Sequence, residues 1–287
     1  MWFFLTLGSA FFQATTDALT KRSLAGTDIF LTAWLRNLLT IPFLLVPLFF
    51  VPMPHIDRMF YIAVGAALPL EIISTIMYTR AIQISPLSLT MPFLALTPLY
   101  LMLTSFLILG EVPSPAGAVG VFMLAAGAYL LNADTLREGG IFAPFKAIYR
   151  EKGSMLMMGV AAIFAITSDL SKLAITHSSP MYFTAFYLVA FSLIFTPLAL
   201  RLSSQPLYSL KGRMSGHMAT GAALAATGLL QNFAITMTQV SYMIAVKRTS
   251  LLFSIVYGYF LFREKKVSVR LLGGAVMVAG LAVISLH

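Results

Sequence analysis

Long apolar stretches, separated by short polar connections, follow one another along the whole chain of 287 residues. A helix needs about 20 consecutive apolar residues to cross the hydrocarbon core of a bilayer. The pattern therefore predicts ten transmembrane helices and little room for a soluble domain. The predicted helices cover about residues 2–20, 29–50, 59–79, 86–109, 115–132, 154–175, 180–200, 217–239, 241–262 and 269–286.

The two halves of the chain repeat each other. Ser168-Asp169 repeats Thr16-Asp17 at an offset of 152 residues, and Ala81-Ile82 recurs as Ala234-Ile235. Each half holds five predicted helices, and an odd number of crossings turns the second half to face the opposite way. Three further positions return at an offset of 153 residues: Glu111, Gly120 and Gly127 as Glu264, Gly273 and Gly280.

These patterns predict an all-α integral membrane protein with ten transmembrane helices arranged as two inverted five-helix repeats. We place the first repeat at residues 1–132 and the second at residues 154–287, with a connecting loop at residues 133–153. The loop holds an amphipathic stretch, which predicts a short interfacial helix on the cytoplasmic surface. Its apolar residues are Phe142, Phe145 and Tyr149, set against Lys146 and Arg150.

The composition indicates that lipid is the solvent of this chain. Hydrophobic residues make up 59% of the chain and charged residues 10%, whereas a soluble domain carries roughly 25% charged residues. The net charge of +9 forms no contiguous basic face, so we expect no nucleic-acid partner. The chain has no cysteine, which excludes disulfides and thiolate metal sites.

The basic residues at and beyond the ends of the predicted helices predict the orientation in the membrane. Only Arg58 and Lys172 follow even-numbered helices. By the positive-inside rule, the odd-numbered connections are cytoplasmic and both termini lie outside the cytoplasm. We expect a multi-pass protein of a prokaryotic cell (inner) membrane. The basic residues that follow odd-numbered helices are Lys21, Arg22, Arg80, Arg137, Lys146, Arg150, Lys152, Arg201, Lys211, Arg213, Arg263, Lys265, Lys266 and Arg270.

Short motifs in both halves carry a family resemblance. The first half has Ala81-Ile82-Gln83-Ile84-Ser85-Pro86 and Leu109-Gly110-Glu111, and the second has Arg248-Thr249-Ser250 and Phe262-Arg263-Glu264. With the glycines that follow them, these runs resemble the EamA-type repeat of the drug/metabolite transporter superfamily over nearly the whole chain. The resemblance implies ten helices, alternating access and a central cavity, and it leaves the substrate open. Many members of that family are similar in placing both termini in the cytoplasm, opposite to the orientation that the charges predict.

Small residues are concentrated in the last predicted helix of each half. Such residues let helix backbones approach closely in a membrane, so we interpret them as helix packing positions, with a dimer contact as the alternative. The protein is expected to be a monomer or a homodimer. We interpret Glu111 and Glu264 as caps at the N-termini of these helices. The small residues are Gly117, Gly120, Ala125 and Gly127, and Gly273, Gly274, Ala279 and Gly280.

Charged side chains inside predicted helices are costly unless they are paired or face water, which makes them candidates for function. Asp17 and Lys21 are four residues apart, and Asp169 and Lys172 are three apart at the equivalent place in the second half. Both spacings allow ion pairs within one helix. We interpret these pairs as structural, with gating of alternate mouths as the functional alternative.

Lys247 and Arg248 lie too deep in the ninth predicted helix to be simple end anchors. The equivalent positions in the first half are Leu94 and Ala95, so the cations break the symmetry of the scaffold. A similar Lys-Arg pair occurs in the related triose-phosphate translocators, where it meets the phosphate. We therefore predict that Lys247 or Arg248, or both, bind an anionic or zwitterionic substrate. The alternative is a structural cation satisfied by a helix C-terminus or by Glu71.

Other polar and aromatic residues are candidates for lining a substrate site. Arg36 and Glu71 are the remaining mid-helix charges, and they predict either a buried structural pair or, for Glu71, a protonatable carboxylate. The lining candidates are Trp34, Tyr78, Tyr100, Gln231 and Asn232.

We therefore expect a secondary transporter that moves a small metabolite, such as an amino acid or an organic acid, by alternating access with ion coupling or exchange. A flippase for lipids or lipid precursors on the same fold is the alternative, and an intramembrane enzyme is less favoured. The histidines His55, His177, His217 and His287 form no metal-ligand spacing, and no catalytic triad pattern is present. We expect no catalytic residues, no metal and no cofactor, and membrane lipid as the surroundings.

Overall fold

A computed structural model of the chain describes residues 1–24, 27–49, 52–84, 91–130, 152–207, 214–262 and 270–285. All regular secondary structure among these residues is helical, with no strand, which confirms the all-α prediction. The first half contains α1 (Trp2–Leu24), α2 (Ile29–Leu38), α3 (Ile41–Leu48), α4 (Arg58–Ile84), the 3-10 helix η1 (Met91–Leu96), α6 (Thr97–Leu109) and α7 (Pro115–Leu130). The second half contains α10 (Lys152–Thr176), α11 (Pro180–Leu202), α12 (Met214–Ile235), α13 (Val240–Lys247), α14 (Ser250–Phe262) and α15 (Arg270–Ser285).

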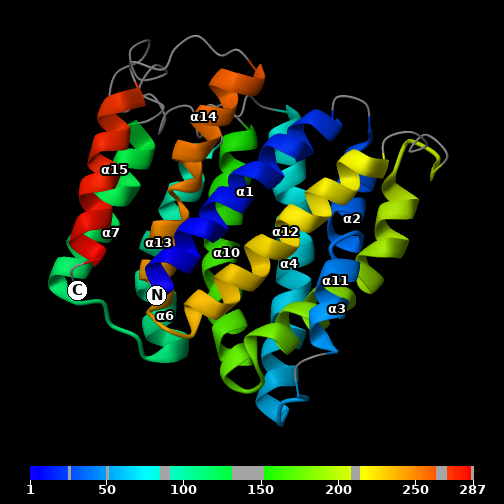
Figure 1. The fold of residues 1–287 in the computed structure, drawn as a ribbon, viewed down its shortest axis with the longest axis horizontal. Helices are drawn as coiled ribbons and strands as arrows, with labels where there is room; N and C mark the ends of the chain where they lie inside the picture. Colours follow the sequence, from blue (N-terminus) through cyan, green and yellow to red (C-terminus); the bar gives the residue numbers. More distant parts are fainter. Residues whose placement is uncertain are drawn as a thin grey trace.

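The helices run side by side as a bundle, and the two termini lie at the lower ends of α1 and α15 in Figure 1. Within the described residues, five helices are long and apolar enough to cross a membrane: Ile29–Val46, Arg58–Ala81, Lys152–Thr176, Pro180–Leu202 and Met214–Ile235. Shorter apolar helices cover Phe93–Leu109, Pro115–Ala128 and Gly273–Ile284. Ten crossings therefore stay a prediction. The predicted interfacial helix at Phe142–Arg150 lies outside the described residues, and α10 already begins at Lys152.

Three stretches that the sequence predicts as single helices are interrupted. The stretch 29–50 is divided at Leu39 and Thr40, because Pro42 has no N–H to continue the helical ladder. The stretch 86–109 includes the 3-10 helix η1, which leads directly into α6. The stretch 241–262 is divided at Arg248 and Thr249, where the amide of Thr249 bonds to the carbonyl of Val246, three residues back.

The interruptions between η1 and α6 and between α13 and α14 are at equivalent places. Thr97, the first residue of α6, and Ser250, the first residue of α14, are separated by the repeat offset of 153 residues. Pro98 follows Thr97 and cannot donate to the carbonyl of Leu94, but the Thr97 hydroxyl donates to that carbonyl at 2.8 Å. In transporters built from inverted repeats, interrupted helices at matching positions are typical of the substrate site.

Helices of one half pack on helices of the other half. α10 packs along α4, and α1 packs along α12, so the first helix of each half lies on the third helix of the other. The last helices, α7 and α15, pack on each other (Figure 1). A two-fold relation between the halves predicts this pattern, in which each contact has a counterpart with the halves interchanged.

Glycines let α7 and α15 approach closely, and the pairing of these glycines shows that the two helices are antiparallel. A Cβ on Gly120 would lie 3.0 Å from the carbonyl oxygen of Gly280, and a Cβ on Gly127 would lie 2.7 Å from that of Gly273. Moving seven residues forward on α7 thus moves the contact seven residues back on α15, so the two helices are antiparallel. Because they are equivalent in the two halves, this is the relation that inversion requires. The interpretation of these glycines as helix packing positions is confirmed, and they face a helix of the same chain.

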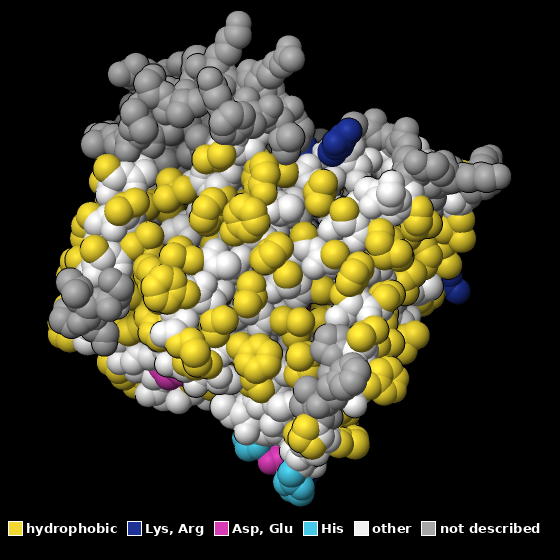
Figure 2. Space-filling view, viewed as in Figure 1, with side chains coloured by type: hydrophobic (Ala, Val, Ile, Leu, Met, Phe, Trp, Pro, Cys, Tyr) yellow, Lys and Arg dark blue, Asp and Glu magenta, His cyan; other side chains and the backbone are white. Residues whose placement is uncertain are grey.

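The outer surface fits a lipid environment. Figure 2 shows apolar side chains over the middle of the visible face, with Lys and Arg near the top and at the right edge, and histidine and acidic side chains in the lower part. Large apolar side chains such as Phe4, Leu103 and Leu193 are 63–76% exposed. An exposed apolar surface of this kind is expected where lipid tails, not water, contact the protein.

Candidate functional site

Charged side chains from four helices meet in the interior of the bundle. Asp17 on α1 interacts electrostatically with Arg36 on α2 and with Lys247 and Arg248 on α13 and its C-cap. Glu71 on α4 interacts with Arg36 and Lys247. All five side chains are half-buried. The structure thus brings together the five mid-helix charges that the sequence scatters over more than 230 positions, and we call them the central cluster.

The interruption of the ninth stretch positions both basic residues of the central cluster. Lys247 is the last residue of α13, and Arg248 is its C-cap. Lys247 Nζ donates to Oε1 of Gln231 on α12. Arg248 Nη2 donates to the hydroxyl of Thr97 at 2.7 Å, and Thr97 begins α6 at the equivalent interruption of the first half. Arg248 therefore joins the two interruptions, whereas Lys247 is held by α12.

The central cluster has more positive than negative charge and has unused donors. Three cations (Arg36, Lys247 and Arg248) face two carboxylates (Asp17 and Glu71), which leaves one positive charge without a counter-charge in the cluster. The Nε–H groups of Arg36 and Arg248 are buried and have no acceptor among the described residues. An unpaired buried donor costs about 1–3 kcal/mol. An arrangement of this kind suits an incoming anion, because guanidinium groups present fixed N–H donors to carboxylate or phosphate oxygens.

The predicted pair between Arg36 and Glu71 is not a direct contact. The two side chains interact electrostatically, but within the described part of the chain neither is held in an ion pair at contact distance. Asp17 accepts a hydrogen bond of 3.0 Å from Gln13, one turn before it on α1. The carboxylates of the cluster are therefore not neutralised by single tight partners.

The aromatic and amide candidates fall into two groups. Tyr78 lies next to the central cluster, since it interacts with Asp17, Arg36 and Arg248. Gln231 holds Lys247. In contrast, Asn232 is buried and donates to the Thr184 hydroxyl at 2.7 Å, so it joins α12 to α11.

The other two aromatic candidates have structural contacts. The indole N–H of Trp34 donates to the hydroxyl of Thr196 on α11 at 2.8 Å. Tyr100 packs against two apolar clusters, one of which contains Phe191 and the other Phe93. These contacts hold helices together next to the central cluster.

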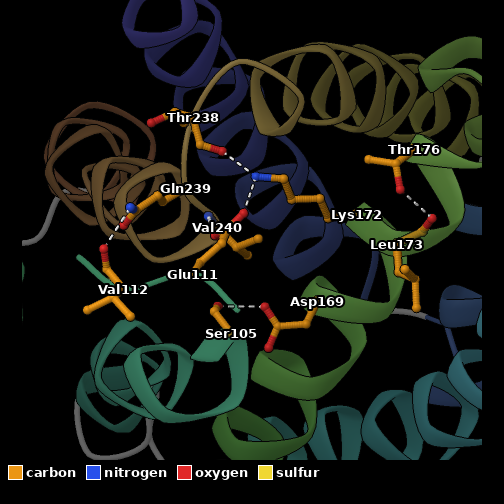
Figure 3. A network of polar contacts seen from close by, with 10 residues as sticks. All are labelled: Ser105, Glu111, Val112, Asp169, Lys172, Leu173, Thr176, Thr238, Gln239 and Val240. Carbon is orange, nitrogen blue, oxygen red and sulfur yellow. Dashed lines mark hydrogen bonds and ion pairs between the residues drawn. The ribbon is translucent and has the colours of Figure 1, made fainter. Parts of the chain in front are cut away.

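A second polar network joins α10, the turn after α6 and the start of α13, toward the end of the bundle at which α1 begins (Figure 3). Lys172, near the C-terminus of α10, forms an ion pair with Glu111 Oε1 in the turn between α6 and α7. Lys172 Nζ also donates to the carbonyl of Thr238 at 2.6 Å. Glu111 Oε2 accepts the amide N–H of Val240 at 2.9 Å, at the first residue of α13. We call this set of contacts the end network.

The end network corrects the predicted role of Glu111. The sequence predicts that Glu111 caps the helix that follows it, but Ser114 does so, because its hydroxyl accepts the amide of Gly117 at 3.1 Å. Gly110, with a left-handed φ of 70°, ends α6 and turns the chain. Glu111 then reaches across to the N-terminus of α13. The equivalent Glu264 lies outside the described residues.

The predicted ion pairs within one helix are wrong in this structure. Lys172 pairs with Glu111, whereas the fully buried Asp169 accepts a hydrogen bond of 2.6 Å from the hydroxyl of Ser105 on α6. Asp17 is bonded to Gln13, and Lys21 is exposed. In both cases a partner outside the predicted pair is nearer to the carboxylate than the basic residue one turn later.

A third polar contact lies outside the helices at the same end. The His177 ring nitrogen Nδ1 lies 2.6 Å from Oδ2 of Asp57, and Asp57 Oδ1 accepts the amides of Met59 and Phe60 at the start of α4. The hydrogen bond to His177, followed by the bond from the Phe60 amide, lowers the pKa of Asp57 despite partial desolvation. This contact connects the segment before α4 with the turn between α10 and α11.

Some residues of these sites cannot be picked out from the sequence. Thr97 and Ser105 are single hydroxyl residues in apolar stretches, and nothing in their local sequence distinguishes them from packing residues. The repeat offers one signal for Thr97, because its counterpart Ser250 is also a hydroxyl residue next to the Lys247-Arg248 pair. Within the described residues, no three His, Asp or Glu side chains come together as a metal site.

The arrangement agrees with the comparisons to known proteins. A family model described as the EamA-like transporter family matches residues 1–133 and again residues 151–286, once for each half of the chain. A solved crystal structure of a protein is similar to this chain with a TM-score of 0.73 and 16% identity, over 99% of this chain and 96% of the other. At that identity the similarity concerns the fold alone. No curated protein matches the chain.

Proposed function

The chain belongs to the EamA-like transporter family, and on that basis we propose that it is a secondary transporter for a small anionic or zwitterionic metabolite. In this proposal, ten membrane-spanning helices form two inverted repeats that open a central site to one side of the membrane at a time. Amino acids and organic acids are the candidate substrates. The chain itself supplies binding groups and moving helices, and no bond in the substrate is broken.

The observation that carries the proposal is the composition of the central cluster. Two arginines with unsatisfied Nε–H donors and one lysine surround the interruption after α13. A carboxylate or phosphate group placed there would accept the free donors and balance the excess positive charge. A zwitterion would in addition bring an ammonium group, for which Asp17 and Glu71 offer carboxylates.

Differences between equivalent parts of the two halves support alternating access. Asp169 is fully buried, whereas its counterpart Asp17 is half-buried. The side chain of Lys172 is 14% exposed and tied to Glu111, whereas Lys21, near the C-terminus of α1, is exposed. The two halves therefore differ at these equivalent positions, as a transporter that alternates between two conformations would allow.

We further propose that the end of the bundle with the end network faces away from the cytoplasm. It contains Asp57 and His177, while the exposed cations Lys21, Arg22 and Arg201 lie at the ends of helices that lead to the opposite side. The positive-inside rule assigns the basic end to the cytoplasm. With a prokaryotic inner membrane as the location, the site would then be accessible from the cytoplasm in this conformation.

Ligand screening followed by transport tests the proposal. Purified protein would be heated with amino acids, dicarboxylates and phosphorylated metabolites, because a ligand that binds the folded state raises its melting temperature by mass action. A compound that gives a shift would be tested for saturable uptake into proteoliposomes. Uptake that the unlabelled compound inhibits supports the proposal. Stabilisation by anionic phospholipid alone, with transfer of labelled lipid between leaflets, would instead favour the flippase alternative.

A further inference from the structure

We propose that Lys172 exchanges between two carboxylates, Glu111 and Asp169, as the mouth at the end network closes and opens. This inference rests on the proposed transport function, since only a transporter needs such a mouth. In the conformation described above, Lys172 is bound to Glu111, and we assign this contact to the closed state of the mouth. In the open conformation, Lys172 is bound to Asp169 on its own helix.

The contacts of Glu111 account for the closed state. Its two carboxylate oxygens hold Lys172 of α10 and the amide of Val240 at the start of α13, while the residue itself belongs to the turn after α6. One side chain thus ties three elements together. Lys172 adds a bond to the carbonyl of Thr238 just before α13. These three contacts lie at low exposure, with 14% of the Lys172 side chain and 17% of the Glu111 side chain accessible.

The position of Asp169 accounts for the open state. It lies three residues before Lys172 on α10, a spacing at which side chains on a helix are neighbours. Its Oδ1 accepts the Ser105 hydroxyl, but its Oδ2 is buried without a partner among the described residues. An unpaired buried carboxylate oxygen is unfavourable. Asp169 is therefore an acceptor that Lys172 can reach by a change of side-chain conformation.

The two states are balanced because a different carboxylate is left without Lys172 in each. In the closed state Asp169 is left with the hydroxyl groups of Ser105 and Thr104 and no cation at contact distance. In the open state Glu111, which lies in a turn at the end of the bundle, gains contact with water. Loss of an ion-pair partner destabilises a charged group less when the group becomes hydrated than when it stays buried. Two conformations of similar free energy are what a ligand can shift by binding one of them better.

The exchange would also connect the mouth to the central cluster. α13 begins at Val240, which Glu111 holds, and ends at Lys247 and Arg248. Its eight residues span about 12 Å. Release of Val240 from Glu111 would free the N-terminus of the helix whose other end carries the proposed anion-binding side chains.

A single reporter cysteine tests the exchange without any substrate, so the result is independent of the transport proposal. The natural chain has no cysteine. Ser241→Cys places a thiol next to Val240, at a position that is 2% exposed. Ser192→Cys on α11, at a position that is 1% exposed, is the matched control for general loosening. The rate of maleimide labelling in detergent would be measured in backgrounds with Glu111→Gln or Asp169→Asn.

The exchange predicts opposite effects of the two substitutions. Glu111→Gln weakens the closed state and raises the labelling rate at Ser241→Cys about tenfold, which corresponds to about 1.4 kcal/mol, with no change at Ser192→Cys. Asp169→Asn removes the alternative partner of Lys172. Labelling at Ser241→Cys then stays at or below the rate of the variant that carries Ser241→Cys alone. If Glu111→Gln does not fold, Glu111→Asp, which shortens the reach by one methylene, is expected to give a smaller rise. Labelling that is unchanged in the Glu111 variants, or that rises equally with Asp169→Asn, would overturn the exchange and leave the network as a fixed structural contact.

Discussion

A Cβ atom on Gly127 of α7 would lie 2.7 Å from the carbonyl oxygen of Gly273 on α15. The same Cβ would lie 2.6 Å from the backbone nitrogen of Met277. Backbone atoms cannot move aside as a flexible side chain can, so the two helices touch where only glycine fits. Together with the contact between Gly120 and Gly280, this fixes α7 and α15 as an antiparallel pair at the junction of the two halves.

The first prediction concerns this junction. Gly127→Ala should destabilise the protein by about 1–3 kcal/mol, because the added methyl group must push two backbones apart. Thermal unfolding in detergent measures the effect. Gly65→Ala is the control, since a Cβ at Gly65 meets nothing within 4 Å and alanine is the better helix former. Equal melting temperatures for Gly127→Ala and Gly65→Ala would show that α7 and α15 are not in close contact.

The second prediction concerns pH. The pKa of Asp57 is lowered in the folded state, with the hydrogen bond to His177 as the largest cause. The resulting stabilisation is present above the unfolded pKa of about 3.9 and is lost as the pH falls through the folded value. Asp57→Asn should therefore make the melting temperature fall less steeply than that of the natural protein on acidification. The effect is expected to be small, because both side chains are more than a third exposed. Parallel pH profiles would contradict the proposed role of the contact.

The third prediction concerns orientation. Ser204 and Thr236 are exposed and lie beyond opposite ends of α12. The basic end is proposed to be cytoplasmic, so a membrane-impermeant thiol reagent should label Thr236→Cys in intact cells and Ser204→Cys only after permeabilisation. The reverse pattern would give the orientation typical of many relatives, with both termini in the cytoplasm.

The sequence predicted the helical class and the repeated halves, because apolar periodicity and glycine spacing are local or regular signals. It also picked out the charges that form the central cluster, since charged residues in apolar stretches stand out. The sequence did not predict that Lys172 binds Glu111, because residue spacing identifies only neighbours on the same helix. That spacing pairs Lys172 with Asp169, whereas the partner of Asp169 in the structure is Ser105, 64 positions away.

The interruptions of the helices were also missed, for two different reasons. Pro42 and Pro98 are visible in the sequence, but proline is tolerated within membrane helices and does not by itself mark a break. The interruption after α13 contains no proline or glycine and coincides with Lys247, Arg248 and Thr249. Its position follows from contacts with Gln231 and Thr97, which come from other helices.

The central claim is that the cations after α13 bind a negatively charged group of the substrate. The most direct test is a binding titration, by calorimetry or thermal shift, of the best ligand from the screen against the natural protein, Lys247→Ala, Arg248→Ala and the control Arg22→Ala. Arg22 is an exposed cation near the end of α1, outside the central cluster. Each variant would first be shown to unfold cooperatively without ligand. Loss of a charge-assisted contact of about 1.5–3 kcal/mol predicts an affinity roughly ten to a hundred times lower for Arg248→Ala or Lys247→Ala, with Arg22→Ala unchanged. Unaltered affinity in both folded cluster variants would show that the pair supports the scaffold and does not bind the substrate.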